Sequence, residues 1–230
     1  KERRILVVGD LHCPFDLDGY LKFLLDTYAK WNCNQILMIG DAIDNHYSSF
    51  HQTDADGYGG GQELDRAIKR LSRYRDAFAE ICDKKIDICI GNHDRIIMRR
   101  AFDSDIPARW IKSYNEVLGT NWNWVESIVY DDVLYEHGEG GQAKSKAVKN
   151  FQSSVCGHTH TEAYVIWNIG TKHKTFGMQV GCGLGESYAF AYAKNFKKQA
   201  IGCGVILGGH TAINVLMPLG KPKPKPTTVL

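Results

Sequence analysis

Three short apolar segments of this chain end in the same way, with a glycine followed at once by an acid or an amide. They read RILVVGD from residue 4, QILMIGD from residue 35 and IDICIGN from residue 86. A short apolar run without polar alternation is typical of a strand in a parallel sheet, because such a strand is buried on both faces. Segments with apolar residues at helical spacing, at 19–31 and 62–82, separate the three runs. The first half of the chain is therefore predicted to form successive β-α-β units.

The second half of the chain is richer in strand-like segments than in helical ones. After a third helical segment at 95–102 and a short helix expected from Pro107, a strand-turn-strand pattern begins at Val125, with its turn at Asp131 and Asp132. Further strands are expected near residues 154–157, 163–169, 174–181, 201–207 and 211–217. Helices are expected there only at 143–151 and around 187–196. This organisation predicts an α/β protein with two packed sheets and helices on the outside.

The length of 230 residues suits one domain, which we expect over residues 1–219. Lys and Pro alternate in the tail at 220–230, which predicts an extended, disordered segment. No apolar run approaches the roughly 18 residues of a membrane-spanning helix, and KERRILVVGD lacks the cleavage site of a signal peptide. We therefore expect no membrane association and a cytoplasmic location.

The cysteines and the net charge exclude two further classes. The seven cysteines are odd in number and form no C-x-x-C pair, so we expect reduced, buried thiols rather than disulfides or a thiolate zinc site. The formal net charge of +2 is too small to indicate nucleic acid by bulk electrostatics alone.

Polar side chains stand at the ends of the predicted strands. The carboxyl ends of parallel strands meet at one edge of an open α/β sheet, and ligands bind there. The side chains expected to converge at this edge are Asp10, His12, Asp41, Asp44, Asn92 and His93. The second half adds three histidines, again after strand-like runs, namely His137 in YEHGEG and His158 and His160 in GHTH.

These residue types point to metal ions. Carboxylates, an amide and imidazoles form a mixed oxygen and nitrogen set that suits borderline divalent ions better than calcium or thiolate-bound zinc. The set exceeds the needs of one ion, and it fits two ions that share a bridging carboxylate, as in phosphoryl transfer. Helix caps, turns and core histidines could explain each residue alone. They do not explain five motifs placed in order at strand ends.

Taken together, GDLH (9–12), GDAID (40–44), GNHD (91–94), HG (137–138) and GHTH (157–160) resemble the five signature blocks of the calcineurin-like metallophosphoesterase superfamily. The resemblance implies a four-layer α-β-β-α sandwich, with two mixed sheets flanked by helices. It also implies two metal sites. The residues implied for the first ion are Asp10, His12, Asp41 and His160, and those for the second are Asp41, Asn92, His137 and His158. Asp41 would then bridge the two ions.

The resemblance further implies an activity, the hydrolysis of a phosphate ester by in-line attack of a hydroxide that bridges the metals. His93 would contact the phosphate and protonate the leaving oxygen, and Asp44 would orient and charge its ring. Mn²⁺ is the expected ion, with Fe, Zn or Ni as alternatives.

One position departs from the family pattern. Protein phosphatases of this superfamily carry an arginine after GDxxD, where a guanidinium can grip a phosphate monoester. Here the residue is Asn45, a candidate substrate contact. The change favours a phosphodiester or nucleotide, nucleic acid included, as the substrate. The alternatives are a phosphomonoesterase, including a protein phosphatase, and a non-catalytic scaffold that retains the fold; the sequence favours no oligomeric state.

The polar, Gly-rich segment 46–62 follows the second motif and is expected to border the active site. Within it, Asp54, Asp56, Gly59 and Asp65 imitate an EF-hand loop, but the Tyr at its fifth position and the Asp at its twelfth depart from that pattern. A mobile loop is therefore expected there rather than a calcium site.

Overall fold

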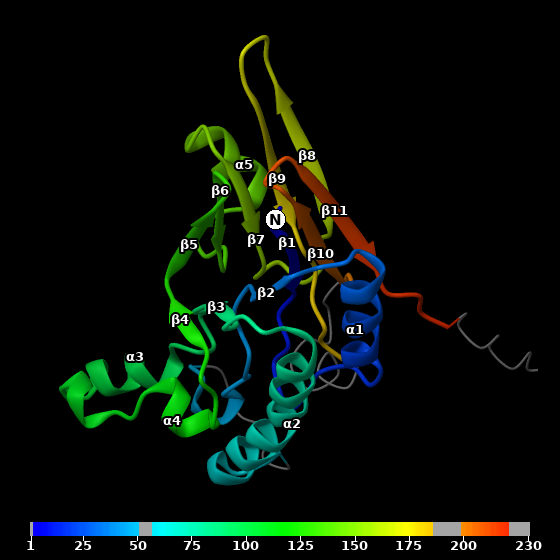
Figure 1. Ribbon diagram of the computed structural model, residues 1–230. Coiled ribbons are helices and arrows are strands. Elements are labelled where there is room, and N and C mark those ends of the chain that lie inside the picture. Colours follow the sequence, from blue (N-terminus) through cyan, green and yellow to red (C-terminus); the bar gives the residue numbers. More distant parts are fainter. Residues whose placement is uncertain (1, 51–56, 186–198, 221–230) are drawn as a thin grey trace, which may run out of the picture.

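The computed structural model describes residues 2–50, 57–185 and 199–220 of the protein (Figure 1). Three sequence-based expectations fall outside these ranges. They are the helix around 187–196, the part of the Gly-rich loop that holds Asp54 and Asp56, and residues 221–230 of the Lys/Pro-rich tail. Each stays a prediction.

The first sheet is built from the β-α-β units that the sequence predicts. Four of its strands are parallel neighbours, β1 (Arg4–Val8), β2 (Gln35–Met38), β3 (Asp87–Cys89) and β4 (Asn123–Val125). Helix α1 (Tyr20–Lys30) links β1 to β2, and α2 (Gly60–Ile81) lies between β2 and β3 in the chain. The parallel direction puts the carboxyl ends of these strands at one edge of the sheet, which is where the polar motifs follow.

Two late strands complete the first sheet from its other side. β10 (Gly202–Leu207) pairs antiparallel with β1, and β11 (Thr211–Leu216) pairs antiparallel with β10. The strand order is β11-β10-β1-β2-β3-β4, so the sheet is mixed. The buried β1 would otherwise have a free edge with unpaired backbone groups, which β10 satisfies.

The second sheet contains the remaining strands. These are β5 (Ser127–Tyr130), β6 (Val133–Glu136), β7 (Ser153–Cys156), β8 (Tyr164–Ile169) and β9 (Lys174–Gln179). Their order is β5-β6-β7-β9-β8; β6, β7 and β9 are parallel neighbours, while β5 and β8 run antiparallel at the two edges. This sheet is therefore mixed as well.

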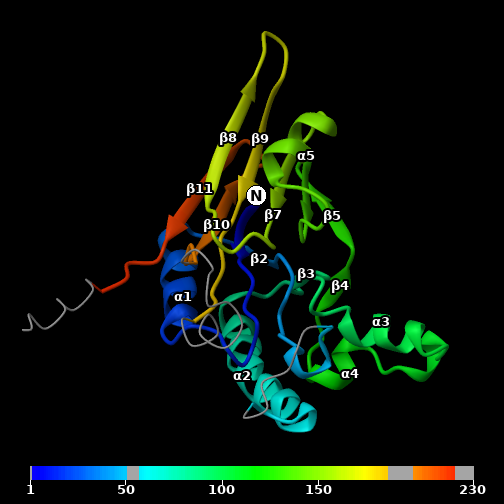
Figure 2. The same ribbon diagram turned by 180° about the vertical axis from the view of Figure 1, so that it is seen from behind.

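Successive side chains of each strand point to opposite faces of the sheet, and this alternation shows what packs on each face. Ile5 and Val7 of β1 face the second sheet and share a core with Val155 and Met178, whereas Leu6 of β1 packs in the core under α1 and α2. Helix α5 (Ala143–Lys149) covers the outer face of the second sheet (Figure 2). Two mixed sheets between helices confirm the predicted four-layer arrangement.

The close approach of α5 depends on one glycine. A Cβ on Gly177 of β9 would lie 2.6 Å from the carbonyl oxygen of Ala143, so any other residue would push the helix away from the sheet. Lys144 and Lys149 of this helix are exposed while Ala143 and Ala147 are buried, as expected of an amphipathic helix with a solvated face.

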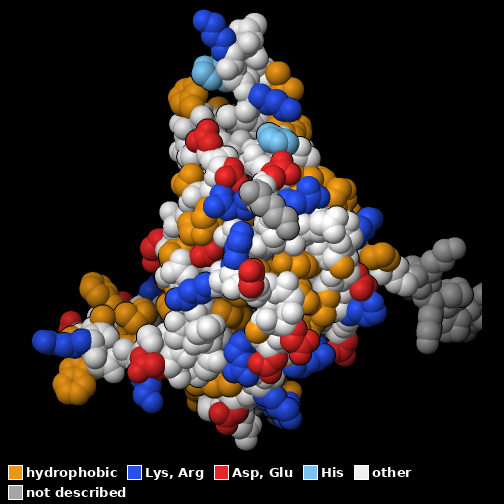
Figure 3. Space-filling model, in the orientation of Figure 1, with side chains coloured by type: hydrophobic (Ala, Val, Ile, Leu, Met, Phe, Trp, Pro, Cys, Tyr) orange, Lys and Arg blue, Asp and Glu red, His pale blue; other side chains and the backbone are white. Residues whose placement is uncertain are grey.

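Short helices occupy the loops beyond β2 and β3. They are η1 (His46–Ser48), α3 (Ile96–Asp103), η2 (Ala108–Trp110) and α4 (Tyr114–Leu118). The helix expected from Pro107 is thus only a single 3₁₀ turn, and α4 begins later, where Ser113 and Glu116 form a capping box. Figure 3 shows hydrophobic side chains gathered where α3 projects, and Phe102 and Trp110 are exposed in this region.

One other expectation concerns the cysteines. All seven cysteines are free and buried, which confirms the reduced thiols. Trp122 is buried and Trp124 stacks on Tyr114, so both pack within the structure. None of the described helices is long and apolar enough to cross a membrane.

Candidate metal centre

The structure brings the nine side chains expected at the strand ends into one region. β1 leads to Asp10 and His12, β2 to Asp41 and Asp44, and β3 to Asn92 and His93. From the second sheet, β6 leads to His137 and β7 to His158 and His160. The convergence occurs because both sheets end their parallel strands at the same side of the sandwich.

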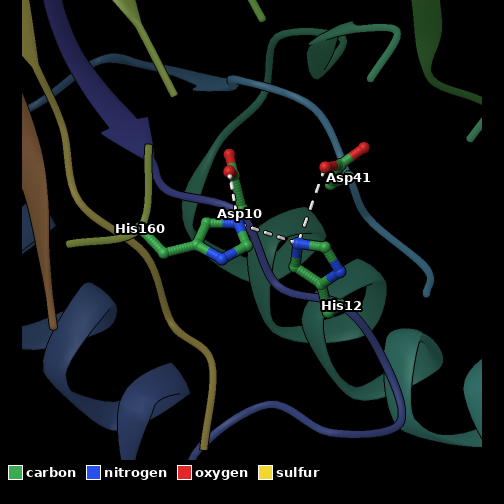
Figure 4. A group of neighbouring side chains, drawn as sticks. All are labelled: Asp10, His12, Asp41 and His160. Atoms are coloured by element: carbon green, nitrogen blue, oxygen red, sulfur yellow. Dashed lines mark hydrogen bonds and ion pairs between the residues drawn. The ribbon is translucent and has the colours of Figure 1, made fainter. Parts of the chain in front are cut away.

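The first cluster contains Asp10, His12, Asp41 and His160, whose side chains point toward one another in Figure 4. One ligand atom from each lies within 4.8 Å of the others. The Nε2 atoms of His12 and His160 are 3.0 Å apart, and His160 Nε2 is 3.1 Å from Asp10 Oδ2. Three of the four side chains are buried, so a charge placed among them would be largely shielded from water.

The second cluster contains Asp41, Asn92, His137 and His158. Asn92 Oδ1 lies 2.9 Å from His137 Nε2 and 2.9 Å from His158 Nδ1. The two histidine nitrogens are 3.2 Å apart. An amide oxygen, a carboxylate oxygen and two imidazole nitrogens therefore surround a second position.

Asp41 belongs to both clusters through one atom. Its Oδ2 is 3.5 Å from His12 Nε2 in the first cluster and 3.2 Å from His137 Nε2 in the second. Its other oxygen, Oδ1, accepts a hydrogen bond from the backbone N–H of His93 at 2.8 Å. That bond fixes the carboxylate so that Oδ2 faces both groups of histidines.

Hydrogen bonds behind the clusters decide which imidazole nitrogens are available. His12 Nδ1 donates to Asp44 Oδ1 at 2.7 Å, and His137 Nδ1 donates to the carbonyl oxygen of Ile39 at 3.0 Å. A carbonyl or carboxylate oxygen can only accept, so each Nδ1 carries a proton and each Nε2 faces its cluster, with a lone pair when the ring is neutral. Metal-binding histidines are commonly oriented in this way.

The arrangement leaves polar atoms that the described part of the chain does not satisfy. Asp10 Oδ1 and Asp44 Oδ2 are buried without a hydrogen-bond partner among the described residues. The Nε2 atoms of His12 and His160 face each other at 3.0 Å, so either a proton or a cation can lie between them. Buried polar atoms without partners are costly. A divalent cation in each cluster would satisfy them, so the residues present fit a metal centre.

The pKa shifts show how negative this region is. Burial alone lowers the pKa of His137, yet the charge of Asp41 and the hydrogen bond to it raise that pKa to about 10. Burial raises the pKa of Asp41, but the charge of His137 outweighs it and holds the pKa well below its usual range. Burial lowers the pKa of His12, despite its hydrogen bond to Asp44, and it lowers the pKa of His158. The field that favours a proton between Asp41 and His137 favours a metal cation equally.

His93 lies beside the first cluster, with its Nδ1 2.6 Å from the backbone carbonyl oxygen of Asp44 and 3.3 Å from Asp44 Oδ1. Burial lowers its pKa, but hydrogen bonding to Asp44 and the charges of Asp41 and Asp44 raise it to about 9. The carboxylate of Asp44 is closer to His12 than to His93. Asp44 therefore holds His93 chiefly through its main chain and His12 through its side chain.

Asn45 stays a candidate substrate contact, and its side chain makes a hydrogen bond within the site. Its Nδ2 donates to the carbonyl oxygen of His93 at 3.0 Å, so this amide joins the second motif to the third. In the described loop beyond it, η1 is held by Glu63 of α2, which accepts hydrogen bonds from the backbone N–H groups of His46 and Tyr47. The start of α2 is thereby attached to the segment that follows Asp44.

The backbone of the site is strained. His12, Asp41, Asn45 and His158 all have positive φ, between 46° and 66°, which is uncommon for residues other than glycine. Such strain is found at functional sites, where the surrounding structure fixes it. Gly91 is required for packing, because a Cβ at this position would overlap Asp41 Oδ1.

Sequence reasoning did not single out Asp94, the last residue of GNHD. Its Oδ1 accepts from the backbone N–H of Ala42 at 3.1 Å and its Oδ2 from that of Gly91 at 2.9 Å. The buried carboxylate thus clamps the loops after β2 and β3 together. Its place within a motif is the only sequence signal, because its partners are main-chain groups that a sequence does not reveal.

Two stacked mixed sheets whose strand ends gather carboxylate, amide and imidazole donors define an α/β protein of the metal-binding type. A family model, the calcineurin-like phosphoesterase, matches residues 3–214. The chain therefore belongs to the calcineurin-like phosphoesterase family. The family binds a dinuclear divalent metal centre, and this chain carries candidate ligands for one.

Solved structures of low sequence identity also match most of the chain. Yfce, a phosphoesterase from E. coli, is 14% identical over 88% of this chain and 87% of its own, with a TM-score of 0.42. Vacuolar protein sorting 29 from Cryptosporidium parvum is 13% identical over 94% and 98%, with a TM-score of 0.45. The nuclease MPE from Pseudomonas putida is 15% identical over 92% and 86%, with a TM-score of 0.38. No curated protein matches the chain.

Proposed function

We propose that this protein is a two-metal-dependent phosphoesterase that hydrolyses phosphodiesters or nucleotides. The observation that carries the proposal is the position of Asp41 Oδ2, within 3.5 Å of a histidine nitrogen in each of the two clusters. A carboxylate shared in this way suits two ions about 3.5–4 Å apart, the spacing of two-metal hydrolases.

The proposed ligands are the members of the two clusters. They are Asp10, His12, Asp41 and His160 for one ion, and Asp41, Asn92, His137 and His158 for the other. The mixture of oxygen and nitrogen donors suits Mn²⁺, with Fe, Zn or Ni as alternatives. When bound, two such ions acidify water and neutralise the charge that develops on the attacking and leaving oxygens.

In this proposal His93 is the general acid. Its Nδ1 proton is held by the carbonyl oxygen of Asp44, so Nε2 is the nitrogen that gives a proton to the leaving oxygen. Without metal, hydrogen bonding to Asp44 and the charges of Asp41 and Asp44 raise the pKa of this imidazole to about 9. Asp44 holds both His93 and His12, so it links the proton donor to the first cluster.

The preference for diesters rests on the residue after GDAID. Asn45 is neutral, and its amide nitrogen is already used by the carbonyl oxygen of His93. A dianionic monoester would lack the guanidinium that grips it in protein phosphatases, whereas a monoanionic diester demands less positive charge. Asn45 therefore acts in this proposal by positioning His93 at the edge of the substrate site.

The proposal keeps two further expectations. One is a single domain over residues 1–219, supported by the family match to residues 3–214. The other is a cytoplasmic location, supported by seven free thiols, because reducing compartments keep cysteines unpaired.

A paired hydrolysis assay tests the proposed activity. The purified protein with Mn²⁺ is assayed on bis-p-nitrophenyl phosphate and on p-nitrophenyl phosphate, with Asp41→Asn as the control. Metal-dependent cleavage that favours the diester and disappears in Asp41→Asn supports the proposal. Faster cleavage of the monoester would instead indicate a phosphomonoesterase, and bound metal without cleavage of either would indicate a scaffold.

A further inference from the structure

A basic groove runs along one face of α2. It has a volume of about 740 Å³, and its walls carry two aromatic rings, a proline and four cationic side chains. The lining residues are Pro14, Phe15, Tyr58, Arg66, Lys69, Arg70 and Arg73. The four cationic residues are spaced three or four apart, so they form one stripe along the helix.

Arg70, one member of the stripe, makes ion pairs within the structure. Arg70 donates from Nε to the buried Asp16 at 2.7 Å and from Nη2 to Asp18 at 2.7 Å. Tyr74 donates its hydroxyl proton to the same carboxylate of Asp16 at 2.6 Å. Arg70 therefore fastens α2 to the loop that follows His12, and its charge is balanced.

The other three cations are exposed and open to a ligand. In the described part of the chain, no carboxylate pairs with Lys69 or Arg73, although Asp65 precedes Lys69 by one helical turn. Arg66 lies over the ring of Tyr58, with its guanidinium carbon 4.1 Å from the ring centroid. An arginine stacked on an exposed tyrosine offers both a charge and an aromatic surface.

Two connections place the groove beside the candidate metal centre. Pro14 and Phe15 follow His12 directly in the loop after β1. One turn before Arg66, Glu63 accepts hydrogen bonds from the backbone of η1, which begins immediately after Asn45. The stripe therefore starts beside the segment that carries Asp44 and continues away from it along α2.

We propose that this groove binds the backbone of a single-stranded nucleic acid next to the phosphodiester that is cleaved. The inference rests on the proposed function, since it assigns a substrate class to the same site. Arg66 to Arg73 span seven residues, or about 10 Å at 1.5 Å per residue, which is long enough to face more than one phosphate of a strand. Cationic grooves lined with aromatic rings are how proteins hold single strands without reading their sequence.

The dimensions and the aromatic wall favour a single strand over a duplex. A volume of 740 Å³ lies in the range of pockets for small ligands and suits a few nucleotides. The ring of Tyr58 can stack only on bases that are not already stacked and paired. DNA and RNA share the required chemistry, so both are used as probes.

Fluorescence anisotropy tests the proposal on the full chain in EDTA, where no cleavage competes with binding. The probes are labelled 12-nucleotide poly-dT and poly-U, a duplex of equal length, and polyglutamate as an anionic competitor. The variant Lys69→Ala/Arg73→Ala is compared with Lys144→Ala/Lys149→Ala, which removes two exposed lysines from α5 on the opposite part of the molecule (Figures 1 and 2).

We expect Lys69→Ala/Arg73→Ala to raise the Kd for the single strands at least tenfold and the α5 variant to change it less than twofold. The slope of log K against log salt should lose about 1.4, because each phosphate contact on a single strand contributes about 0.7. Tyr58→Leu should weaken binding about fivefold, through lost stacking. With Mn²⁺, the ratio of kcat/KM on the oligonucleotide to that on bis-p-nitrophenyl phosphate should fall tenfold in Lys69→Ala/Arg73→Ala.

Four outcomes would overturn the inference: no binding of either single strand by the wild type, equal weakening by the two double variants, a duplex bound as tightly as a single strand, or polyglutamate competing as well as the unlabelled oligonucleotide. Hydrolysis of bis-p-nitrophenyl phosphate by the wild type is read separately. If that cleavage persists while strand binding fails, the groove assignment is wrong and the phosphoesterase assignment stands. If cleavage fails while strands bind to the groove, the phosphoesterase assignment is wrong and the assignment of strand binding to the groove stands.

Discussion

Two buried polar regions of this protein lie only a few residues apart in the loop after β1, and they differ in how their charges are satisfied. Asp16 accepts hydrogen bonds from Arg70 and Tyr74, so both of its carboxylate oxygens have partners within the chain. Asp10 has one oxygen with no partner among the described residues, and the Nε2 atoms of His12 and His160 lie 3.0 Å apart beside it. The Asp16 region holds α2 in place, whereas the polar atoms of the Asp10 region need a bound ligand, such as a cation, to satisfy them.

The two regions differ in whether their carboxylate oxygens have hydrogen-bond partners, and they do not differ in burial. Both aspartates are buried, at 0% and 7% exposure for Asp10 and Asp16. Buried groups that the protein itself pairs stabilise one conformation, while unpaired ones mark a place for a ligand. Changes in the first region should therefore affect stability, and changes in the second should affect metal binding and activity.

The largest effect is expected where the bridging carboxylate would be displaced. In Gly91→Ala the new Cβ overlaps Asp41 Oδ1, so the carboxylate must move away from both clusters. Misplacement of a catalytic group by about 1 Å costs around 10²-fold, and the loss of metal ligands adds to this, so kcat/KM should fall by about 10³-fold or more. Gly61→Ala, where a Cβ meets nothing within 4 Å, is the matched control. Activity within about threefold of wild type in Gly91→Ala would contradict this view of the site.

The next effect concerns the proton donor. His93→Asn should retain bound metal and lower kcat by about 10²-fold on a substrate with a poor leaving group, because positioned general acids contribute about 10²–10⁴-fold. The loss should be much smaller on p-nitrophenyl esters, whose leaving group needs no proton. Metal analysis and steady-state kinetics check this, with His173→Asn in the turn between β8 and β9 as the control. Equal losses on the two kinds of leaving group would exclude the acid role.

A smaller effect, on stability, is expected in the region around Asp16. Tyr74→Phe removes one hydrogen bond to Asp16, which keeps its bonds to Arg70. The expected cost is about 1–2 kcal/mol in the free energy of unfolding, with kcat/KM unchanged within about threefold. Denaturant unfolding and kinetics measure the two quantities. A fall in metal affinity as large as that of a cluster variant would erase the distinction between the two regions.

The pH dependence of stability should differ between the metal-free and metal-loaded protein. Without metal, interactions with Asp41 and Asp44 raise the pKa values of His137 and His93 to about 10 and about 9, above the unfolded value near 6.5. Their contribution is present below about pH 6.5 and is lost as pH rises through 9–10. Metal binding requires unprotonated histidines and strengthens with pH.

Thermal unfolding in EDTA and in Mn²⁺ between pH 6.5 and pH 9.5 measures this difference. The Tm gained from Mn²⁺ should widen by about 5 °C or more across the range, since about 1 kcal/mol corresponds to 2–4 °C for a protein of this size. A constant gap would mean that protonation of His137 does not compete with a metal ion.

The sequence predicts much of this molecule because its signals are local. The runs before Gly9, Gly40 and Gly91 have the apolar pattern of buried strands, and the residues that follow them must then meet at one sheet edge. The same reasoning found the two histidines of GHTH, which the structure divides between the two clusters.

What the sequence does not predict depends on contacts between distant segments. Nothing in the pattern of β10 and β11 reveals that they join the first sheet beside β1, because a strand's partner is chosen by the free edge it covers. The clamp formed by Asp94 and the hydrogen bond from Asn45 to His93 both involve main-chain groups, so no side-chain pattern records them. The stripe on α2 is visible in sequence, but its groove appears only once the loop after His12 is folded against the helix.

The central claim is that two metal ions share Asp41, and the number of Mn²⁺ ions bound per chain tests it most directly. Metal analysis after gel filtration should give two ions for the wild type, fewer than one for Asp41→Asn, and one for His158→Ala, which alters only the second cluster. Two ions retained by Asp41→Asn, or a single ion bound by the wild type at saturation, would contradict the account.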